Sequence, residues 1–270
     1  MKQTNIFFSV FTIIITLAIV SCQKVININL NSSAPQFVVE GSVTDSLQPF
    51  LVKITRSVNF DQDNVFPAVS GARVAITDKN TGHTDSLSET HPGLYQTTGL
   101  LTAGVPGHTY FLYINAGGKI LTATSTMPMP VTLDSLYTQI AGFRRGSISV
   151  VPVYTDPVEK GNFYRFVVTK NDTVSDAIYV RSDKLVNGQV IKQPLNGGGG
   201  SGSKIQPADF ITVELQCIDS MIYQFYYTLQ QSRSSNSATP TNPVSNIMGG
   251  QALGYFSAHT TRSKSIIVPF

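Results

Sequence analysis

Short runs of alternating apolar and polar residues, each closed by a turn signal, are the feature that most constrains the fold of this chain. Alternation over about four to eight residues is typical of a half-buried strand, because successive side chains point to opposite faces. The breaks carry Pro92-Gly93, Pro106-Gly107 and Gly117-Gly118, which are typical of turns. Seven such runs fall within about 90 residues: 37–43, 50–57, 72–77, 84–87, 94–98, 109–115 and 120–126. They predict a β-sandwich domain over residues 36–127, of immunoglobulin-like or prealbumin-like type.

The second half of the chain is predicted to form a second β-rich domain over residues 133–270. A Pro-x-Pro connector at 128–132 separates the two, since proline stiffens a linker and cannot donate to a sheet. One packed helix is expected from about Ser220 to Gln231, because Asp219 can cap it and apolar residues follow at helical spacing. Further strands are expected at 147–154, 163–170, 177–181 and 211–217. The predicted fold class is therefore mostly β.

Composition separates this chain from two other classes of protein. Of the 270 residues, 41% are apolar and only 13% are charged, with a formal net charge of +3. A disordered chain has few apolar residues and a high net charge, so we expect a packed core. Nucleic-acid-binding proteins concentrate basic residues in a patch or stripe, and no such concentration is seen here. No nucleic-acid partner is therefore expected.

Residues 1–21 have the features of an export signal. Lys2 precedes an apolar run from Ile6 to Val20, which is shorter than the roughly 20 residues that a membrane-spanning helix needs. The run ends in Ile19-Val20-Ser21-Cys22, which resembles the lipobox of bacterial lipoproteins. An ordinary secretory signal or an uncleaved anchor would share the apolar run. We expect removal of residues 1–21, lipidation of Cys22 and a tether over residues 22–35 that leads to a membrane.

The other cysteine, Cys217, is predicted to be structural. It alternates with Ile211, Val213 and Leu215, so it is expected on a buried face as a small hydrophobe. A catalytic thiol needs a nearby base, and no histidine lies within 40 residues of it.

Catalytic and metal-binding patterns find little support in the sequence. The histidines His83, His91, His108 and His259 stand singly, without a second ligand at metal-binding spacing. Asp61 and Asp63 lack the glycine and the closing glutamate of a calcium loop, and the glycine-rich stretch 196–203 is expected to be a flexible hairpin loop. No Gly-x-Ser-x-Gly motif occurs. We expect a non-catalytic protein with no metal and no cofactor.

One tripeptide recurs more often than chance predicts. Asp, then Ser or Thr, then an apolar residue or Thr occurs five times, whereas the composition predicts about one occurrence. The pattern resembles the O-glycosylation sequon of exported Bacteroidota proteins. Turn formation is an equal alternative, since Asp-Ser pairs begin turns and cap helices, as Asp219-Ser220 is expected to do. The candidate glycosylation sites are Ser46, Ser86, Ser135 and Thr173.

Eight short stretches follow one another along the chain after the cysteine. They are Lys24–Leu30, Phe37–Gly41, Arg56–Phe60, Phe66–Ala72, Pro92–Tyr95, Thr124–Pro128, Pro243–Ile247 and Gly254–Ala258. In this order they resemble the Bacteroidota lipoprotein family called domain of unknown function 4249. The resemblance implies a lipoprotein of the outer membrane, in a family often encoded beside TonB-dependent transporters and without an established activity.

On this basis we expect a non-catalytic accessory or ligand-binding partner of a TonB-dependent nutrient transporter. A structural or adhesive cell-surface module is the alternative. Family members commonly carry acidic residues after the cysteine, where this chain has Gln23-Lys24, so the periplasmic or surface leaflet stays open. Gly254 and Phe256 are expected to serve a turn and the core, and no ligand-binding residue is assigned.

Overall fold

A computed structural model describes residues 34–59, 62–63, 65–98, 102–140, 147–195, 204–233 and 242–270. Residues 35–270 form one compact unit. The predicted signal peptide, Cys22, nearly all of the predicted tether, Asp61 and the glycine-rich stretch 196–203 lie outside the described residues.

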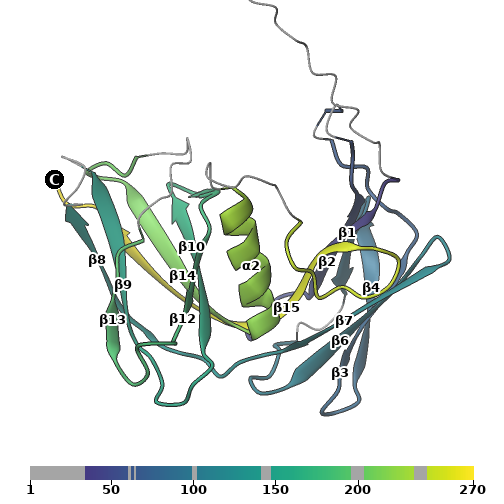
Figure 1. The fold of residues 1–270 in the computed structure, drawn as a ribbon, viewed down its shortest axis with the longest axis horizontal. Coiled ribbons are helices and arrows are strands. Elements are labelled where there is room, and N and C mark those ends of the chain that lie inside the picture. The colour runs from purple at the N-terminus through teal and green to yellow at the C-terminus, as the bar shows by residue number, and fades with distance from the viewer. Residues whose placement is uncertain are drawn as a thin grey trace, which may run out of the picture. The chain divides into compact units, whose positions relative to one another are not determined.

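The described residues form strands throughout and one helix (Figure 1). The helix is α2 (Ser220–Ser232). The strands are β1 (Phe37–Thr44), β2 (Leu51–Arg56), β3 (Arg73–Asp78), β4 (Thr84–His91), β5 (Leu94–Thr97), β6 (Thr109–Ala116), β7 (Lys119–Thr126), β8 (Leu133–Ile140), β9 (Ile148–Thr155), β10 (Phe163–Lys170), β11 (Thr173–Val174), β12 (Tyr179–Ser182), β13 (Val190–Lys192), β14 (Phe210–Ile218) and β15 (Leu253–Ile267). The prediction of a mostly β fold with one packed helix is confirmed, and each predicted strand forms with its ends shifted by a few residues.

Most strands belong to one continuous hydrogen-bonded sheet of 12 strands. Its order is β11-β10-β14-β15-β1-β2-β5-β4-β3-β6-β7, with β12 paired to β10, and a separate three-stranded sheet has the order β13-β9-β8. Neighbouring strands are antiparallel except for β1 and β15, which run parallel.

The strands from β1 to β7 form the predicted sandwich. Alternate residues point inward, as in β6, where Tyr110, Leu112 and Ile114 are buried and the residues between them are partly exposed. The large sheet curls until β15 lies close to β6 and β7, so these strands enclose the same core. The fully buried side chains of Val39, Ile54, Ile76, Leu112, Leu121 and Phe256 fill this core.

A second core lies between the small sheet and the other part of the large sheet. It contains Tyr154, Tyr164, Phe166, Ile211, Val213 and Cys217. Cys217 is 3% exposed and its Sγ accepts a hydrogen bond from the amide of Val131, so the prediction of a buried structural cysteine is confirmed. The division into domains at 128–132 stays a prediction.

Helix α2 packs on the large sheet through its predicted apolar stripe. Ile222, Phe225 and Tyr226 are buried against residues that include Ile218 and Tyr255. The predicted cap is confirmed, because the Asp219 carboxylate accepts a hydrogen bond from the amide of Ile222 at 2.9 Å.

Strand β15 is the main element that the sequence patterns miss. Its first half, Leu253–His259, pairs with β1, and its second half, Thr260–Ile267, pairs with β14 (Figure 1). Serine, threonine and charged residues fill most of the positions outside Phe256 and Ala258, so no apolar alternation marks it. This one strand therefore pairs both with the sandwich, through β1, and with the strands of the second half of the chain, through β14.

Replacing Asp219 with alanine is expected to destabilise the fold by about 2–4 kcal/mol. The carboxylate caps α2 and also accepts a hydrogen bond from the buried Ser125 hydroxyl of β7, which itself accepts from the amide of Ala258. A lost cap costs about 1 kcal/mol, and a lost hydrogen bond to a charged group costs roughly 1.5–3 kcal/mol. Urea unfolding followed by circular dichroism measures the loss. Asp219→Asn keeps an acceptor and should recover part of it, whereas a loss below about 1 kcal/mol for alanine would contradict this role.

Candidate functional site

A polar groove of about 370 Å³ lies on the large sheet beside α2. Strands β1, β10, β14 and β15, the segment after β1 and the helix all contribute side chains to it. The lining residues are Ser42, Thr44, Ser46, Gln48, Arg165, Glu214, Gln216, Tyr226, Tyr255, Ser257, His259, Thr261 and Ser263. No residue of this set was assigned as a ligand-binding residue from the sequence.

The strand registers explain why polar side chains meet here. In β15, Phe256 and Ala258 point into the sandwich core, so Ser257 and His259 face the opposite side of the sheet. The pairing then aligns neighbouring strands on that side: Ser42 lies opposite Ser257, Thr44 opposite His259, Thr261 opposite Gln216, and Gln216 opposite Arg165. A row of polar residues from four strands results.

The two charged side chains of the groove are linked through an amide. Arg165 donates from Nη1 to Oε1 of Gln216 at 2.9 Å, and Nε2 of Gln216 donates to Oε1 of Glu214 at 2.6 Å. The Arg165 guanidinium also stacks on the ring of Tyr226, with 4.1 Å from its central carbon to the ring centroid. The Tyr226 ring lies 5.3 Å from that of Tyr255. This network fixes the position of the guanidinium.

His259 is the buried titratable group of the groove. It is 6% exposed, and its Nδ1 lies 3.0 Å from the Ser257 hydroxyl. Burial, reinforced by the positive charge of Arg165, lowers the pKa of His259 from 6.5 to about 4. The imidazole is therefore neutral near pH 7. A serine next to a histidine has the composition of a nucleophile and its base, but a general base works best with a pKa near the operating pH, and this pKa is far below it.

The buried His259 is expected to make stability fall on acidification. Its pKa is lower in the folded than in the unfolded chain, so the unfolded chain binds the proton first as the pH drops. Its contribution is complete above about pH 6.5 and is lost progressively as the pH falls towards 4, to a total of roughly 3 kcal/mol. Unfolding free energies of wild type and His259→Gln, measured between pH 7.5 and pH 4, test this. A difference between the two that does not change with pH would contradict it.

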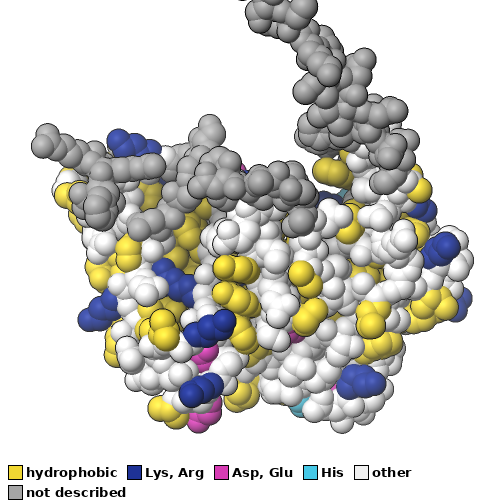
Figure 2. Space-filling model, in the orientation of Figure 1, with side chains coloured by type: hydrophobic (Ala, Val, Ile, Leu, Met, Phe, Trp, Pro, Cys, Tyr) yellow, Lys and Arg dark blue, Asp and Glu magenta, His cyan; other side chains and the backbone are white. Residues whose placement is uncertain are grey.

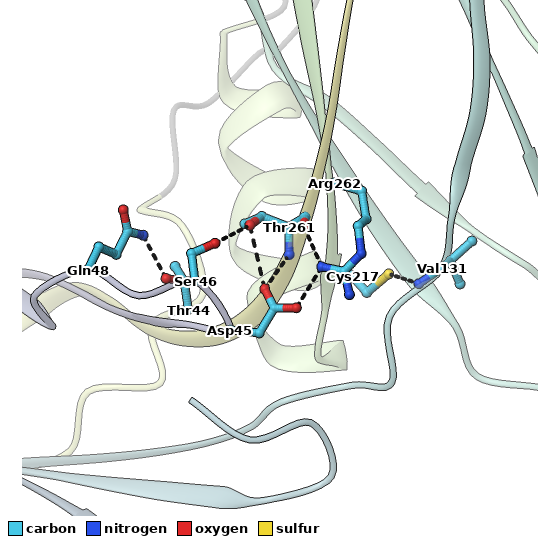
Figure 3. Close-up of polar contacts among 8 residues, drawn as sticks. All are labelled: Thr44, Asp45, Ser46, Gln48, Val131, Cys217, Thr261 and Arg262. Atoms are coloured by element: carbon cyan, nitrogen blue, oxygen red, sulfur yellow. Dashed lines mark hydrogen bonds and ion pairs between the residues drawn. The ribbon is translucent and has the colours of Figure 1, made fainter. Parts of the chain in front are cut away.

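A carboxylate fixes the segment at the rim of the groove (Figure 3). Asp45 accepts hydrogen bonds from the amide of Thr261 at 2.8 Å and from Nη1 of Arg262 at 2.6 Å. The Ser46 hydroxyl lies 3.2 Å from that of Thr261, and Gln48 donates to the Thr44 hydroxyl. These contacts join the end of β1 to the middle of β15 and hold the rim in place.

The four candidate glycosylation residues are all exposed. Ser46 follows β1, Ser86 lies in β4, Ser135 in β8 and Thr173 in β11. They lie in separate segments of the chain and do not form a common site. Their exposure leaves each hydroxyl accessible, and glycosylation stays a prediction.

The glycine, phenylalanine and histidine residues considered in the sequence analysis can also be placed in the structure. Phe256 is fully buried, so its expected core role is confirmed. The turn expected at Gly254 is wrong, because this residue lies within strand β15, where its φ of +100° accompanies a close approach to the backbone of Val39. His108 contacts the Asp78 carboxylate at 2.8 Å, and His83 contacts that of Asp85 at 3.3 Å.

The described part of the chain lacks both a metal-binding cluster and a membrane-spanning helix. Within residues that the structure places, no three or more His, Cys, Asp or Glu side chains gather so as to hold a metal ion. Nor does any helix in that part have the length and apolarity required to cross a membrane. On the face drawn in Figure 2, lysine and arginine side chains are dispersed and form no continuous stripe.

Comparison with known proteins identifies the family. The family described as "Domain of unknown function (DUF4249)" matches residues 23–265, which is most of the chain. The chain therefore belongs to this family, and the family predicted from the eight ordered stretches is confirmed.

Two solved structures are also similar to the chain. A two-domain fibronectin type III segment from chicken tenascin has 13% identity and a TM-score of 0.21, and the match covers 70% of this chain and 93% of that one. The chicken interferon gamma receptor alpha chain has 9% identity and a TM-score of 0.25, with 88% and 99% covered. No curated protein matches the chain.

Proposed function

We propose that this chain is a non-catalytic lipoprotein of the outer membrane that binds a ligand for a TonB-dependent nutrient transporter. The polar groove between α2 and strands β1, β15, β14 and β10 carries the ligand-binding part of this proposal. Ligand sites are concave and combine aromatic walls with a few fixed polar groups. Tyr255, with the buried Tyr226 beside it, supplies such a wall. Arg165, Gln216 and Glu214 supply polar groups held in position by one another.

The chemistry of the groove supports binding without catalysis. Its histidine has a pKa of about 4 and is a weak base. The carboxylate of Glu214 has no second carboxylate beside it among the residues that line the groove, so the paired acid and base of a hydrolase do not come together there.

The anchor and the partner rest on the sequence. The family match begins at Gln23, directly after Cys22, which supports a mature chain that starts at the lipidated cysteine. The link to a TonB-dependent transporter follows from the resemblance to lipoproteins often encoded beside such transporters.

Uptake by cells tests this function. Deleting the gene is expected to reduce growth on one nutrient and uptake of that nutrient, and wild-type protein is expected to restore both. Arg165→Met, which breaks the contacts to Gln216 and Tyr226, should not restore uptake, whereas Arg73→Met, at an exposed position of β3, should. Both variants must reach wild-type abundance. Unchanged uptake in the deletion strain on every nutrient tested would refute the proposal, and loss of cell adhesion alone would favour the structural or adhesive alternative.

A further inference from the structure

Two hydroxyl groups of the groove have no partner among the described residues, and a third can still donate. The side chains of Ser42 and Ser263 make no hydrogen bond to any residue that the structure describes. The Thr44 hydroxyl accepts from Gln48 and can still donate. Each hydroxyl is both a donor and an acceptor and rotates to suit its partner. These groups match a ligand whose own polar groups are hydroxyls.

The charges of the groove oppose an ionic ligand of either sign. Arg165 and Glu214 both contact Gln216, so an anion attracted to the guanidinium would also meet the carboxylate. A cation attracted to the Glu214 carboxylate would likewise meet the Arg165 guanidinium. Two further carboxylates near the groove are neutralised by ion pairs. Glu40 of β1, opposite Tyr255, pairs with Lys53, and Asp45 at the rim pairs with Arg262. His259, neutral because of its low pKa, adds no charge. The groove is thus polar and close to electrically neutral.

The aromatic lining and the volume of the groove indicate which class of ligand it can bind. Tyr255 presents aromatic surface against which an apolar ring face can pack, whereas the Tyr226 ring is buried and covered by the Arg165 guanidinium. The sheet below is lined with hydroxyls and amides. A volume of about 370 Å³ is near the lower end of the roughly 300–1,000 Å³ that is common for ligand sites. A short ligand with one apolar ring face and a hydroxyl-rich edge fits this description.

We propose that the groove binds a neutral, polyhydroxylated ligand of the short-saccharide class. This inference deepens the proposed ligand-binding function and rests on it. The hydroxyls of Ser42, Thr44 and Ser263 bond the ligand hydroxyls, and the Tyr255 ring packs against a ring face of the ligand. Arg165 and Glu214 act as a balanced donor and acceptor pair.

A binding measurement on the acylated, full mature protein tests the ligand class. The detergent is a polyoxyethylene ether, because a maltoside would itself present sugar. Maltotriose, cellotriose, mannotriose and xylotriose are the neutral probes, and trigalacturonic acid and chitosan trimer are the anionic and cationic probes. Saturation-transfer NMR detects binding and calorimetry measures the affinity. At least one neutral trisaccharide is expected to bind, with an affinity that changes less than about 2-fold between 50 and 500 mM NaCl, since screening weakens only charged interactions.

Two serine variants locate the site without disturbing the fold. The double variant Ser42→Ala, Ser263→Ala removes hydroxyls that have no partner in the described structure, so its unfolding midpoint should equal that of wild type. Its affinity should fall roughly 2- to 10-fold for each hydroxyl that bonds the ligand. Ser88→Ala, at an exposed position of β4, is the matched control and should bind as wild type does.

Three outcomes would overturn the inference. They are binding of the charged probes alone, binding of no probe, and unchanged affinity in the double serine variant. The uptake experiment on the deletion strain does not depend on these probes. A transporter phenotype together with binding of charged probes alone would therefore reject the saccharide class and leave the accessory function standing.

Discussion

Gly254→Ala is expected to destabilise the fold by about 4 kcal/mol or more, which is a large part of the roughly 5–15 kcal/mol that typically keeps a protein folded. A Cβ at this position would lie 1.9 Å from the carbonyl oxygen of Val39, which is backbone in the paired strand β1 and cannot move aside. The residue also has a φ of +100°, where a side chain is strained. Gly254 pairs with Val39 in the parallel ladder of β1 and β15, so the substitution disrupts the contact that joins these two strands.

A variant at a second glycine distinguishes the effect of the steric clash from the effect of the backbone strain. Gly82 has a φ of +78°, but nothing lies within 4 Å of its Cβ position. Gly82→Ala should therefore cost only about 1–2 kcal/mol. Urea unfolding of both variants, made from residue 23 without the lipid, measures the difference. Equal losses in the two variants would show that the close approach of Gly254 to β1 is not important for stability.

Cys22→Ala is expected to move the protein from the membrane to the soluble fraction almost completely. Two or three acyl chains anchor a protein stably, since each buried methylene contributes about 0.8 kcal/mol, whereas one chain binds only marginally. Without the thiol the acyl chains have no attachment point. Fractionation of cells followed by mass spectrometry of the intact protein measures both location and acylation.

The other cysteine is the control for this experiment. Cys217→Ala removes a buried thiol from the second core and should leave the protein acylated and membrane-bound, with a small loss of stability. Membrane attachment of Cys22→Ala at the wild-type level would contradict lipidation at Cys22 and favour an uncleaved apolar anchor.

The sequence was sufficient for the elements whose pattern is local. The sandwich strands alternate with turn residues between them, and α2 has its cap at Asp219 and its apolar stripe within one segment. Strand β15 could not be recognised in the same way. Its partners β1 and β14 bury it from both edges, and its inward face carries Thr260 as well as Phe256 and Ala258, so polar residues occur on both faces.

The groove could not be predicted from the sequence, because its residues are distant along the chain. Arg165, Glu214, Gln216 and His259 are up to 94 positions apart and meet only through the registers of β10, β14 and β15. Register is set by packing across the sheet, and a shift by one residue would turn each of these side chains to the other face. Polar residues at alternate positions, such as Glu214 and Gln216 between Val213, Leu215 and Cys217, were the one available signal.

Purification of the protein in mild detergent from the membranes of cells that produce it naturally tests the proposed function most directly. The exposed C-terminal Phe270 offers a position for the affinity tag, and an unrelated lipoprotein purified in the same way is the control. We expect mass spectrometry to find a TonB-dependent barrel at near-equal abundance with the wild-type protein and not with the control. A lipoprotein that is recovered from that membrane without any such barrel would contradict the accessory role.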